Sequence, residues 1–412
     1  MHHFEYRDGI LSAEEVSVTA LAEEYGTPLY IYSAATLRRH FKAFDSAFNE
    51  LDHLTCYSIK ANSNLAVLKL LAAEGAGMDI VSGGELYRAL KAGVTPEKIV
   101  YSGVGKRDSE IREALEAGIL MFNVESVAEL KRINTVASDM GMTAKVSFRI
   151  NPDVDPQTHP YISTGMQENK FGLDIENSLA AYTLAAELEN VEPVGMDCHI
   201  GSQLTKIDPF LEALDKLLDF NEKLKGLGIN IKYLDLGGGL GIPYDKEEPP
   251  HPSEFGKALS AKLKGLPLKV IFEPGRVIAG NAGIMVTQVV YTKSNPTKNF
   301  LIVDAAMNDL IRPSLYGSYH RIGEVELKGR QHQRFDVVGP ICESGDFLAR
   351  DRELPTVDQG ERLVVYSAGA YGFTMASNYN TRPRACELLV DGSNVTVARK
   401  RETYEDLIAN EL

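Results

Sequence analysis

The fold is decided by the stretch LTCYSIKANSNLAVLKLLAAEGAGMDIVSGGELYRALKAGVTPEKIVYS, residues 54–102. It alternates short apolar runs with longer amphipathic runs, and each amphipathic run ends at a glycine. Short apolar runs between turn signals predict buried strands, and glycine commonly terminates a helix. The stretch therefore predicts a strand–helix unit that repeats about every 22 residues, a length that suits tight connections.

The same alternation continues to about residue 275 and yields eight strand candidates. They are LTCYSI (54–59), GMDIV (77–81), KIVYS (98–102), LMFNV (120–124), KVSFRI (145–150), VGMDCHI (194–200), YLDLG (233–237) and LKVIFE (268–273). Eight regular units predict an α/β fold with an N-terminal (β/α)8 TIM-like barrel, its helices outside the strands. An open doubly wound sheet is the alternative, and the regularity of the units favours the closed barrel.

After residue 280 the pattern changes to β-branched runs separated by turns. These runs include GIMVTQVVYT (283–292), NFLIVDAA (299–306), RFDVVGPI (334–341) and ERLVVYSAG (361–369). The turn DGS at 391–393 lies between two alternating runs, which predicts a hairpin. We therefore predict a barrel domain over residues 26–278 and a mostly β domain, a β-barrel or sandwich, over residues 279–412, which residues 1–25 join.

Composition excludes several functional classes. The 412 residues include 43 Lys and Arg against 57 Asp and Glu, a net charge of −14, whereas nucleic-acid binding needs a surplus of cations. A hydrophobic content of 44% excludes disorder as the main state. No apolar run reaches the length of a membrane span, and the start MHHFEYRDG lacks the features of a signal peptide. The four cysteines form no CxxC pair, so we expect a cytoplasmic protein with reduced thiols.

Candidate site residues follow the predicted strands, because active sites of parallel barrels form at the carboxyl ends of their strands. Lys60 follows the first strand and His199 lies at the end of the sixth. The run Gly237–Gly239 follows the seventh strand, and Glu273 ends the eighth. Each residue alone has a plainer explanation, such as a surface lysine, a core histidine or a tight turn. Their convergence at one end of the barrel favours a functional site.

Together the four groups have the chemistry of a pyridoxal phosphate site. A lysine amine can form a Schiff base with an aldehyde, and glycine N–H groups can cradle a phosphate. A carboxylate can keep a pyridine nitrogen protonated, and an imidazole can lie flat against the ring. The glycine run fits neither nucleotide-loop pattern, because Ile242 stands where GxGxxG needs glycine and no GK[ST] follows. No His, Asp or Glu cluster has the spacing of metal ligands, so we predict no metal site.

Six motifs resemble those of the barrel-type, fold type III pyridoxal phosphate-dependent decarboxylases, and among them the diaminopimelate decarboxylases. The motifs are YSIKANSN (57–64), HIGSQ (199–203), GGG (237–239), EPGR (273–276), CESGD (342–346) and GAYG (369–372). The resemblance extends from about Tyr30 to the C-terminus. It implies pyridoxal 5'-phosphate as cofactor and a homodimer with active sites shared across the subunit interface.

The resemblance also implies a role for each motif residue. Lys60 matches the Schiff-base lysine, His199 the histidine stacked on the ring, and Glu273 the partner of the pyridine nitrogen. The remaining cofactor contacts match Ser202, Gly238, Gly239, Gly275, Arg276 and Tyr371. The substrate contacts match Arg276, Arg312, Tyr316, Glu343 and Tyr371, of which the first three hold the distal carboxylate. Cys342 and Glu343 match the pair from the other subunit that donates a proton and binds the substrate ammonium.

The implied reaction is the decarboxylation of meso-diaminopimelate to L-lysine and CO2, the last step of lysine biosynthesis. Arg276 and Arg312 offer planar forks for a distal carboxylate, and Glu343 offers an acceptor for a distal ammonium. The alternative is a decarboxylase of the same fold for ornithine, arginine or lysine. Those relatives typically carry Asp where this chain has Glu343, and they lack a segment like RPSLY (312–316).

Two further alternatives fit less well. Racemases of this barrel pair the pyridine nitrogen with Arg, whereas this chain has Glu273. A regulator without activity would have lost cofactor contacts that this chain retains. We also expect MQENKFG (166–172), after the fifth strand, to form a mobile loop near the mouth of the site.

Overall fold

The structure is a computed structural model that describes residues 2–155 and 170–411 and divides the chain into two compact units. The barrel unit comprises Phe41–Ile242 and Glu248–Val277. The β unit comprises Met1–His40, Pro243–Glu247 and Ile278–Leu412.

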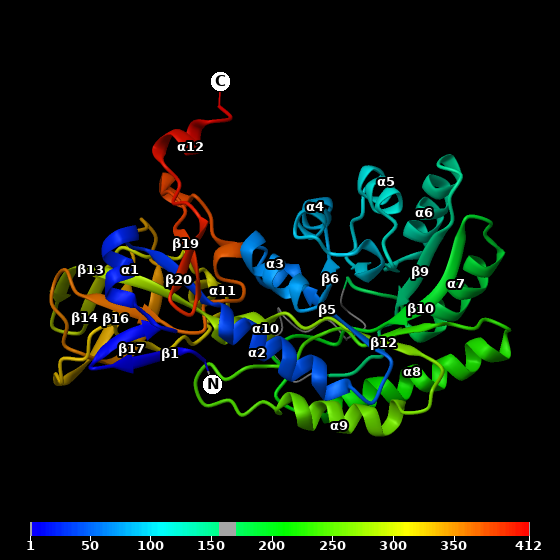
Figure 1. Ribbon diagram of the computed structural model, residues 1–412, viewed down its shortest axis with the longest axis horizontal. Helices are drawn as coiled ribbons and strands as arrows, with labels where there is room; N and C mark the ends of the chain where they lie inside the picture. The colour runs from blue at the N-terminus through cyan, green and yellow to red at the C-terminus, as the bar shows by residue number, and fades with distance from the viewer. Residues whose placement is uncertain (1, 156–169, 412) are drawn as a thin grey trace. The chain divides into compact units, whose positions relative to one another are not determined.

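Eight parallel strands close into a barrel in the order β10-β11-β12-β5-β6-β7-β8-β9 (Figure 1). Their bounds are β5 (His53–Ser58), β6 (Gly77–Ile80), β7 (Ile99–Tyr101), β8 (Met121–Val124), β9 (Ala144–Arg149), β10 (Val191–Asp197), β11 (Tyr233–Asp235) and β12 (Lys269–Phe272). The barrel closes between β12 and β5, where Phe272 lies opposite Thr55. The predicted fold class is confirmed, and all eight strand candidates are barrel strands.

A helix follows each barrel strand and lies outside it (Figure 1). The helices are α3 (Leu65–Ala73), α4 (Gly83–Lys91), α5 (Asp108–Ala117), α6 (Val127–Asp139), α7 (Ile175–Glu187), α8 (Asp208–Gly226), α9 (Pro252–Leu263) and α10 (Arg276–Ala279). Local residues set the helix ends: the Asn64 side chain accepts from the N–H of Ala66 at the start of α3, and Gly118 ends α5 at φ 75°.

The barrel interior is apolar at the amino ends of the strands and polar at their carboxyl ends. The apolar cluster comprises Leu54, Cys56, Val100, Leu120, Met121, Val194 and Ile271. Buried polar side chains at or near the carboxyl ends of the strands include Asp79, Asn123, Asp197 and Asp235. Because a buried polar group is costly without partners, this polar layer marks the end of the barrel where a ligand would contribute most.

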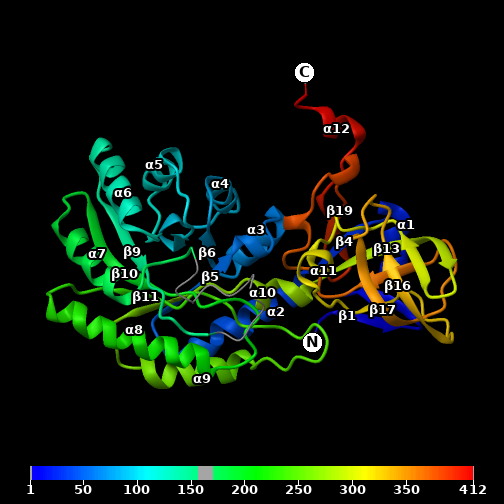
Figure 2. The same cartoon turned by 180° about the vertical axis from the view of Figure 1, so that it is seen from behind.

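The β unit is built on a large mixed sheet with the strand path β17-β16-β14-β13-β4-β19-β20, several of whose strands are labelled in Figure 2. Strand β18 pairs with β13 and with β15. The strands are β4 (Leu29–Ser33), β13 (Gly283–Ser294), β14 (Asn299–Val303), β15 (Ile322–Glu324), β16 (His332–Val338), β17 (Phe347–Pro355), β18 (Arg362–Val365), β19 (Cys386–Asp391) and β20 (Asn394–Arg399). The predicted hairpin at 391–393 is confirmed by the pairing of β19 with β20.

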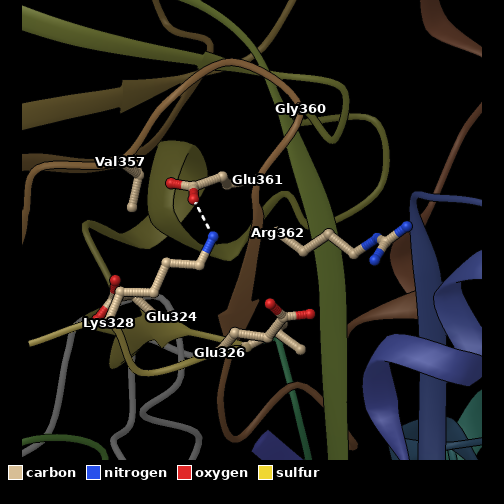
Figure 3. Close-up of a pocket in the computed structure, with 8 residues that line it drawn as sticks. Glu324, Glu326, Lys328, Val357, Gly360, Glu361 and Arg362 are labelled. Atoms are coloured by element: carbon tan, nitrogen blue, oxygen red, sulfur yellow. Dashed lines mark hydrogen bonds and ion pairs between the residues drawn. The ribbon is translucent and has the colours of Figure 1, made fainter.

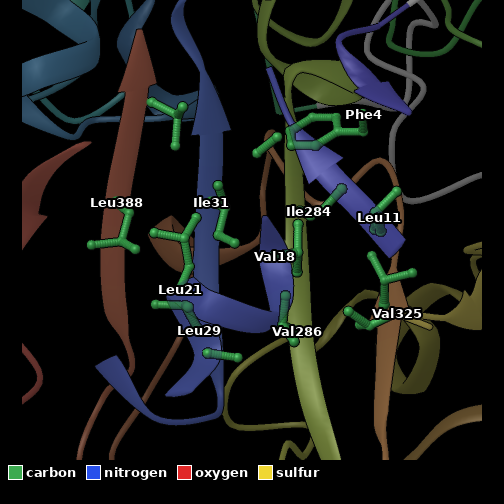
Figure 4. Packing of buried hydrophobic residues seen from close by; sticks show 14 of the residues in the cluster. Phe4, Leu11, Val18, Leu21, Leu29, Ile31, Ile284, Val286, Val325 and Leu388 are labelled. Atoms are coloured by element: carbon green, nitrogen blue, oxygen red, sulfur yellow. The ribbon is translucent and has the colours of Figure 1, made fainter. Parts of the chain in front are cut away.

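The N-terminal part of the β unit is longer than the expected residues 1–25. Strand β4 pairs with β13 in antiparallel register, with Tyr32 opposite Gly283, and with β19 in parallel register. Figure 4 shows the core that results, in which Leu29 and Ile31 of β4 lie beside Leu388 of β19. The unit also includes β1 (Phe4–Arg7), β2 (Ile10–Ala13), β3 (Val16–Ser17) and α1 (Val18–Tyr25).

Among residues 2–155 and 170–411, no helix is long and apolar enough to cross a membrane. All four cysteines are free thiols, and only Cys342 is exposed. Residues 166–169 of the expected mobile loop lie outside the described residues.

Candidate active site at the carboxyl ends of the barrel strands

Lys60 lies in the turn that follows β5 and is held by a buried carboxylate. Its Nζ donates to Asp79 Oδ2 at 2.7 Å, and the Ser58 hydroxyl donates to the same oxygen at 2.7 Å. The Asp79 side chain is fully buried, whereas that of Lys60 is 35% exposed. The amine is therefore held in place yet accessible, as a nucleophile that must reach an aldehyde requires.

Glu273 directly follows β12 and is a buried carboxylate surrounded by other carboxylates. Asp197 and Asp235 each place a carboxylate oxygen within 4.8 Å of it and of one another. Burial, followed by the charges of Asp235 and Asp79, raises the pKa of Glu273 well above its usual value. The Asn123 amide donates to Glu273 at 3.4 Å and to Asp235 at 3.3 Å. This cluster of carboxylates therefore holds protons that a bound base could share.

We predict that replacing Asp235 with asparagine flattens the pH dependence of stability. Burial raises the pKa of Asp235 from its usual 3.8 to about 6. The folded state therefore binds more protons than the unfolded state between these values, and the free energy of unfolding falls as pH rises from 4 through 6. The difference corresponds to about 3 kcal/mol.

Urea unfolding between pH 4 and 8 measures this effect. In Asp235→Asn the fall across this range should shrink by a comparable amount, whereas Asn at the exposed Asp219 should leave it unchanged. Parallel curves for the wild type and Asp235→Asn would contradict the assignment.

His199 follows β10 and presents a neutral imidazole. Its Nδ1 accepts from the N–H of Gly238 at 3.2 Å, which leaves the ring proton on Nε2. Burial, together with the positive charges of Arg149 and Lys60, lowers the pKa of His199 well below its usual value. The ring is therefore an uncharged flat surface near neutral pH, suited to contact with another ring.

The glycine run Gly237–Gly239 after β11 packs its backbone directly against the turns that follow β10 and β12. A Cβ at Gly238 would lie 2.2 Å from the carbonyl oxygen of Glu273, and one at Gly239 would lie 2.3 Å from that of Gly201. Gly239 also has φ +110°, where side chains are strained. Only glycine fits this arrangement, and the backbone N–H groups of such a turn suit a phosphate.

We predict that Gly239→Ala weakens cofactor binding and stability together. The new Cβ would force the 199–203 turn away and should cost about 1–3 kcal/mol. Gly93→Ala is a matched control, because Gly93 has φ +85° but has nothing within 4 Å of its Cβ position. Thermal unfolding and a cofactor titration should show a larger loss for Gly239→Ala. Equal effects of the two substitutions would show that the close packing does not matter.

Arg276 and Gly275 join the same group of turns. Arg276 is buried, and its Nη2 donates to Ser202 Oγ at 3.0 Å. A Cβ at Gly275 would lie 2.9 Å from that of Ala61, so this turn packs directly on the Lys60 turn. The Ser58 hydroxyl links Asp79 with the carbonyl of Glu273, 2.7 and 2.9 Å away. The structure therefore brings together the predicted barrel residues Lys60, His199, Ser202, Gly238, Gly239, Glu273, Gly275 and Arg276.

The remaining predicted residues lie in the β unit. Arg312 and Tyr316 bound the short helix α11 (Arg312–Tyr316), and Arg312 is buried. Tyr371 is partly exposed and has φ +56°, a conformation uncommon for a non-glycine residue outside functional sites.

Cys342 and Glu343 are exposed on a braced turn of the β unit. The buried Asp346 accepts from the N–H of Ile341 and from that of Met307, both at 2.8 Å. The N–H of Cys342 donates to Asn380 Oδ1 at 2.9 Å. The turn therefore holds a thiol and a carboxylate outward in a defined geometry.

Sequence reasoning missed several residues of these groups. Asp79, Asp197 and Asp235 were treated only as parts of apolar runs, although an acidic residue at the same place in three predicted strands was a usable signal. Asn123 gave no such signal, because its partners Asp235 and Glu273 lie more than 100 residues away in the chain.

Another cavity, of about 130 Å³, lies in the β unit (Figure 3). Its charged lining includes Glu324, Glu326 and the ion pair between Lys328 and Glu361. The described residues that line it include none of the predicted site residues. Because Lys328 is already paired with Glu361 and no predicted site residue lines this cavity, we do not assign it as the active site.

The chain is similar in sequence and in structure to known pyridoxal-dependent decarboxylases. Residues 34–280 match a family model described as "Pyridoxal-dependent decarboxylase, pyridoxal binding domain". The chain is 53% identical to a diaminopimelate decarboxylase of Pseudomonas aeruginosa, over 100% of this chain and 99% of that protein. Diaminopimelate decarboxylase from Helicobacter pylori, complexed with L-lysine, is 44% identical with a TM-score of 0.92, covering 95% of this chain and 98% of that one. The enzyme from M. jannaschii, in co-complex with L-lysine, is 42% identical with a TM-score of 0.94, covering 99% and 97%.

Proposed function

The chain belongs to the diaminopimelate decarboxylases, a family of pyridoxal-dependent decarboxylases, and we propose how its own residues carry out their reaction. The enzyme is a carbon–carbon lyase that converts meso-diaminopimelate to L-lysine and CO2, the last step of lysine biosynthesis. The observation that carries the residue assignment is the placement of Lys60 and Glu273 at one end of the same barrel. Lys60 contacts Asp79, and Ser58 links Asp79 with the backbone carbonyl of Glu273.

The residues present fit pyridoxal phosphate. When bound, the cofactor supplies an aldehyde that takes up the substrate amine and a ring that accepts the electrons left by CO2. Lys60 would hold the aldehyde, and Glu273 would share its proton with the pyridine nitrogen. His199 would lie against the ring as a neutral imidazole. The phosphate would be held by Ser202, Gly238, Gly239, Gly275, Arg276 and Tyr371.

Glu273 and the carboxylates around it can provide the proton that the pyridine nitrogen of the cofactor would share. Because burial and the nearby carboxylates raise the pKa of Glu273, this group retains a proton at pH values where an exposed glutamate has lost it. A proton shared with a pyridine nitrogen places a positive charge among the carboxylates, which stabilises the whole cluster.

Residues of the β unit would bind the distal end of the substrate and supply the proton that replaces CO2. Arg312, Arg276 and Tyr316 would bind the distal carboxylate, and Glu343 the distal ammonium. The Cys342 thiol would donate a proton from Sγ to the carbon that has lost CO2. Orientation by these groups selects which carboxylate leaves, since only one end of the substrate can reach Lys60.

We predict that Arg312→Lys lowers kcat/KM for diaminopimelate by roughly 10- to 150-fold, because a charged hydrogen bond contributes about 1.5–3 kcal/mol. Lysine keeps the charge but loses one arm of the fork. The visible absorbance of the bound cofactor should not change. Arg334→Lys is the control, because Arg334 is exposed and lies in β16. Unchanged turnover in Arg312→Lys would show that the clamp assignment is wrong.

We further propose a homodimer in which Cys342 and Glu343 complete the site of the partner subunit. The exposure of both residues on a braced turn supports this, because an exposed thiol and carboxylate held in a defined geometry are accessible to a second subunit. A cytoplasmic location is also proposed, and the four free thiols support it, since reduced cysteines are typical of that compartment.

A further inference from the structure

Arg312 is surrounded by groups from its own unit that fix the plane of its guanidinium. Its Nη1 lies 2.8 Å from His320 Nε2, and its Nη2 donates to Ser318 Oγ at 3.3 Å. The ring of Tyr244 lies 4.6 Å from the guanidinium carbon and meets the His320 ring edge to face at 5.3 Å. His320 and Ser318 therefore bind the edge of the guanidinium, and the Tyr244 ring lies near it.

The chain between these residues folds back to make this contact. Helix α11 ends at Gly317, whose φ of +62° turns the chain, and the N–H of Ser318 lies 3.4 Å from the carbonyl of Arg312. His320 lies eight positions after Arg312 in the chain, and the turn places their side chains side by side. The segment RPSLYGSYH (312–320) is therefore one structural unit.

The hydrogen-bond partners of His320 determine which of its ring nitrogens carries the proton. Its Nδ1 lies 2.9 Å from the carbonyl oxygen of Tyr366, which can only accept, so Nδ1 must carry a proton. The guanidinium of Arg312 can only donate, so Nε2 must be the unprotonated acceptor. His320 is fully buried, so no water offers an alternative partner from bulk solvent.

We propose that His320 is a positioning residue that determines substrate specificity: as a neutral acceptor of fixed tautomer, it orients the Arg312 guanidinium toward the distal carboxylate of the substrate. The proposal rests on the assignment of Arg312 as the carboxylate clamp. His320 binds Nη1 and Ser318 binds Nη2, so these two contacts fix the plane in which the guanidinium meets a carboxylate. Without His320, Arg312 would keep its positive charge but lose the hydrogen bond that orients its guanidinium.

The test compares two ligands of the holoenzyme. L-Lysine retains the carboxylate at the centre that does not react, whereas 1,5-diaminopentane lacks it. In His320→Asn, which keeps a donor for the Tyr366 carbonyl but does not reach Arg312, L-lysine binding should weaken about tenfold. Binding of 1,5-diaminopentane should stay within about twofold, and KM for diaminopimelate should rise more than kcat falls. Equal weakening of both ligands would indicate a merely structural role and overturn the proposal.

Two further variants separate a positioning role from a loss of folding. His320→Gln restores an acceptor near the place of Nε2 and should recover most L-lysine binding. Ser318→Ala removes the weaker contact to Arg312 without changing the buried histidine, and should weaken L-lysine binding about two- to fivefold. No effect of Ser318→Ala and no recovery in His320→Gln would together reject the proposal, even if His320→Asn failed to fold.

A double variant distinguishes this inference from the clamp assignment itself. If His320 acts through Arg312, adding His320→Asn to Arg312→Lys should cause no further loss of L-lysine binding. Additive losses would show that His320 acts independently and would overturn the inference while leaving the clamp in place. No loss in Arg312→Lys alone would instead reject the clamp.

Discussion

Replacing Lys60 with arginine should reduce kcat by at least about 10³-fold, since acid–base participation alone contributes about 10²–10⁴-fold. Arginine stays protonated and cannot form a Schiff base, yet it keeps a positive charge beside the buried Asp79. The protein should therefore remain folded, while the visible absorbance that marks the cofactor held through Lys60 should disappear. Turnover, absorbance and thermal unfolding measure the three effects.

Two comparisons make the Lys60 result specific. Lys60→Ala should lose the same activity but also stability, because it leaves the Asp79 carboxylate buried without its cation. Alanine at Lys69, an exposed residue of α3, should change neither property. Retention of more than about 0.1 per cent of the wild-type kcat in Lys60→Arg would contradict the role of this lysine as the covalent anchor.

Replacing Cys342 with alanine should lower L-lysine production by about 10²–10⁴-fold through loss of the proton donor. Cofactor absorbance should be unchanged, since Cys342 lies in the β unit and is assigned no cofactor contact. Ser344→Ala is the matched control, because Ser344 is also exposed on the same turn. A cofactor spectrum altered as strongly as turnover would argue against a proton donor.

The Cys342 variant also tests whether the site is shared between subunits. Lys60→Ala and Cys342→Ala should each lose nearly all activity by themselves. If Cys342 completes the site of the partner subunit, a heterodimer of the two contains one intact site. Subunit exchange at equal amounts should restore about a quarter of the wild-type activity, because half of the dimers are mixed and each has one good site. No recovery after verified exchange would mean that each site is complete within one chain.

The barrel could be predicted because its signals are local. The hydrophobic pattern of each strand–helix unit is visible within that unit, and a glycine within the unit marks the end of its helix. The eight strands could therefore be identified without knowing which strands pair. Strand β4 was not assigned to the β unit, because its partners β13 and β19 lie more than 240 residues away in the chain. Local periodicity contains no information about such distant pairing.

The site was predicted only in part for the same reason. Residues that directly follow strands, such as Lys60 and Glu273, were found from the barrel rule alone. The Asp235 carboxylate and Asn123 amide meet Glu273 only because strand register turns them inward, and that register is not visible in one sequence. The roles of Arg312 and Cys342 follow from the family resemblance alone, because neither residue follows a barrel strand.

The most direct test is a product assay on four substrates: meso-diaminopimelate, ornithine, arginine and lysine, each with and without added pyridoxal phosphate. The enzyme should release one CO2 and one L-lysine from each diaminopimelate, more with added cofactor where the protein is incompletely loaded, and little from the other three. The Lys60→Arg protein should release at least about 10³-fold less CO2 from diaminopimelate. Preferred turnover of ornithine, arginine or lysine, or CO2 from diaminopimelate without L-lysine, would contradict the account.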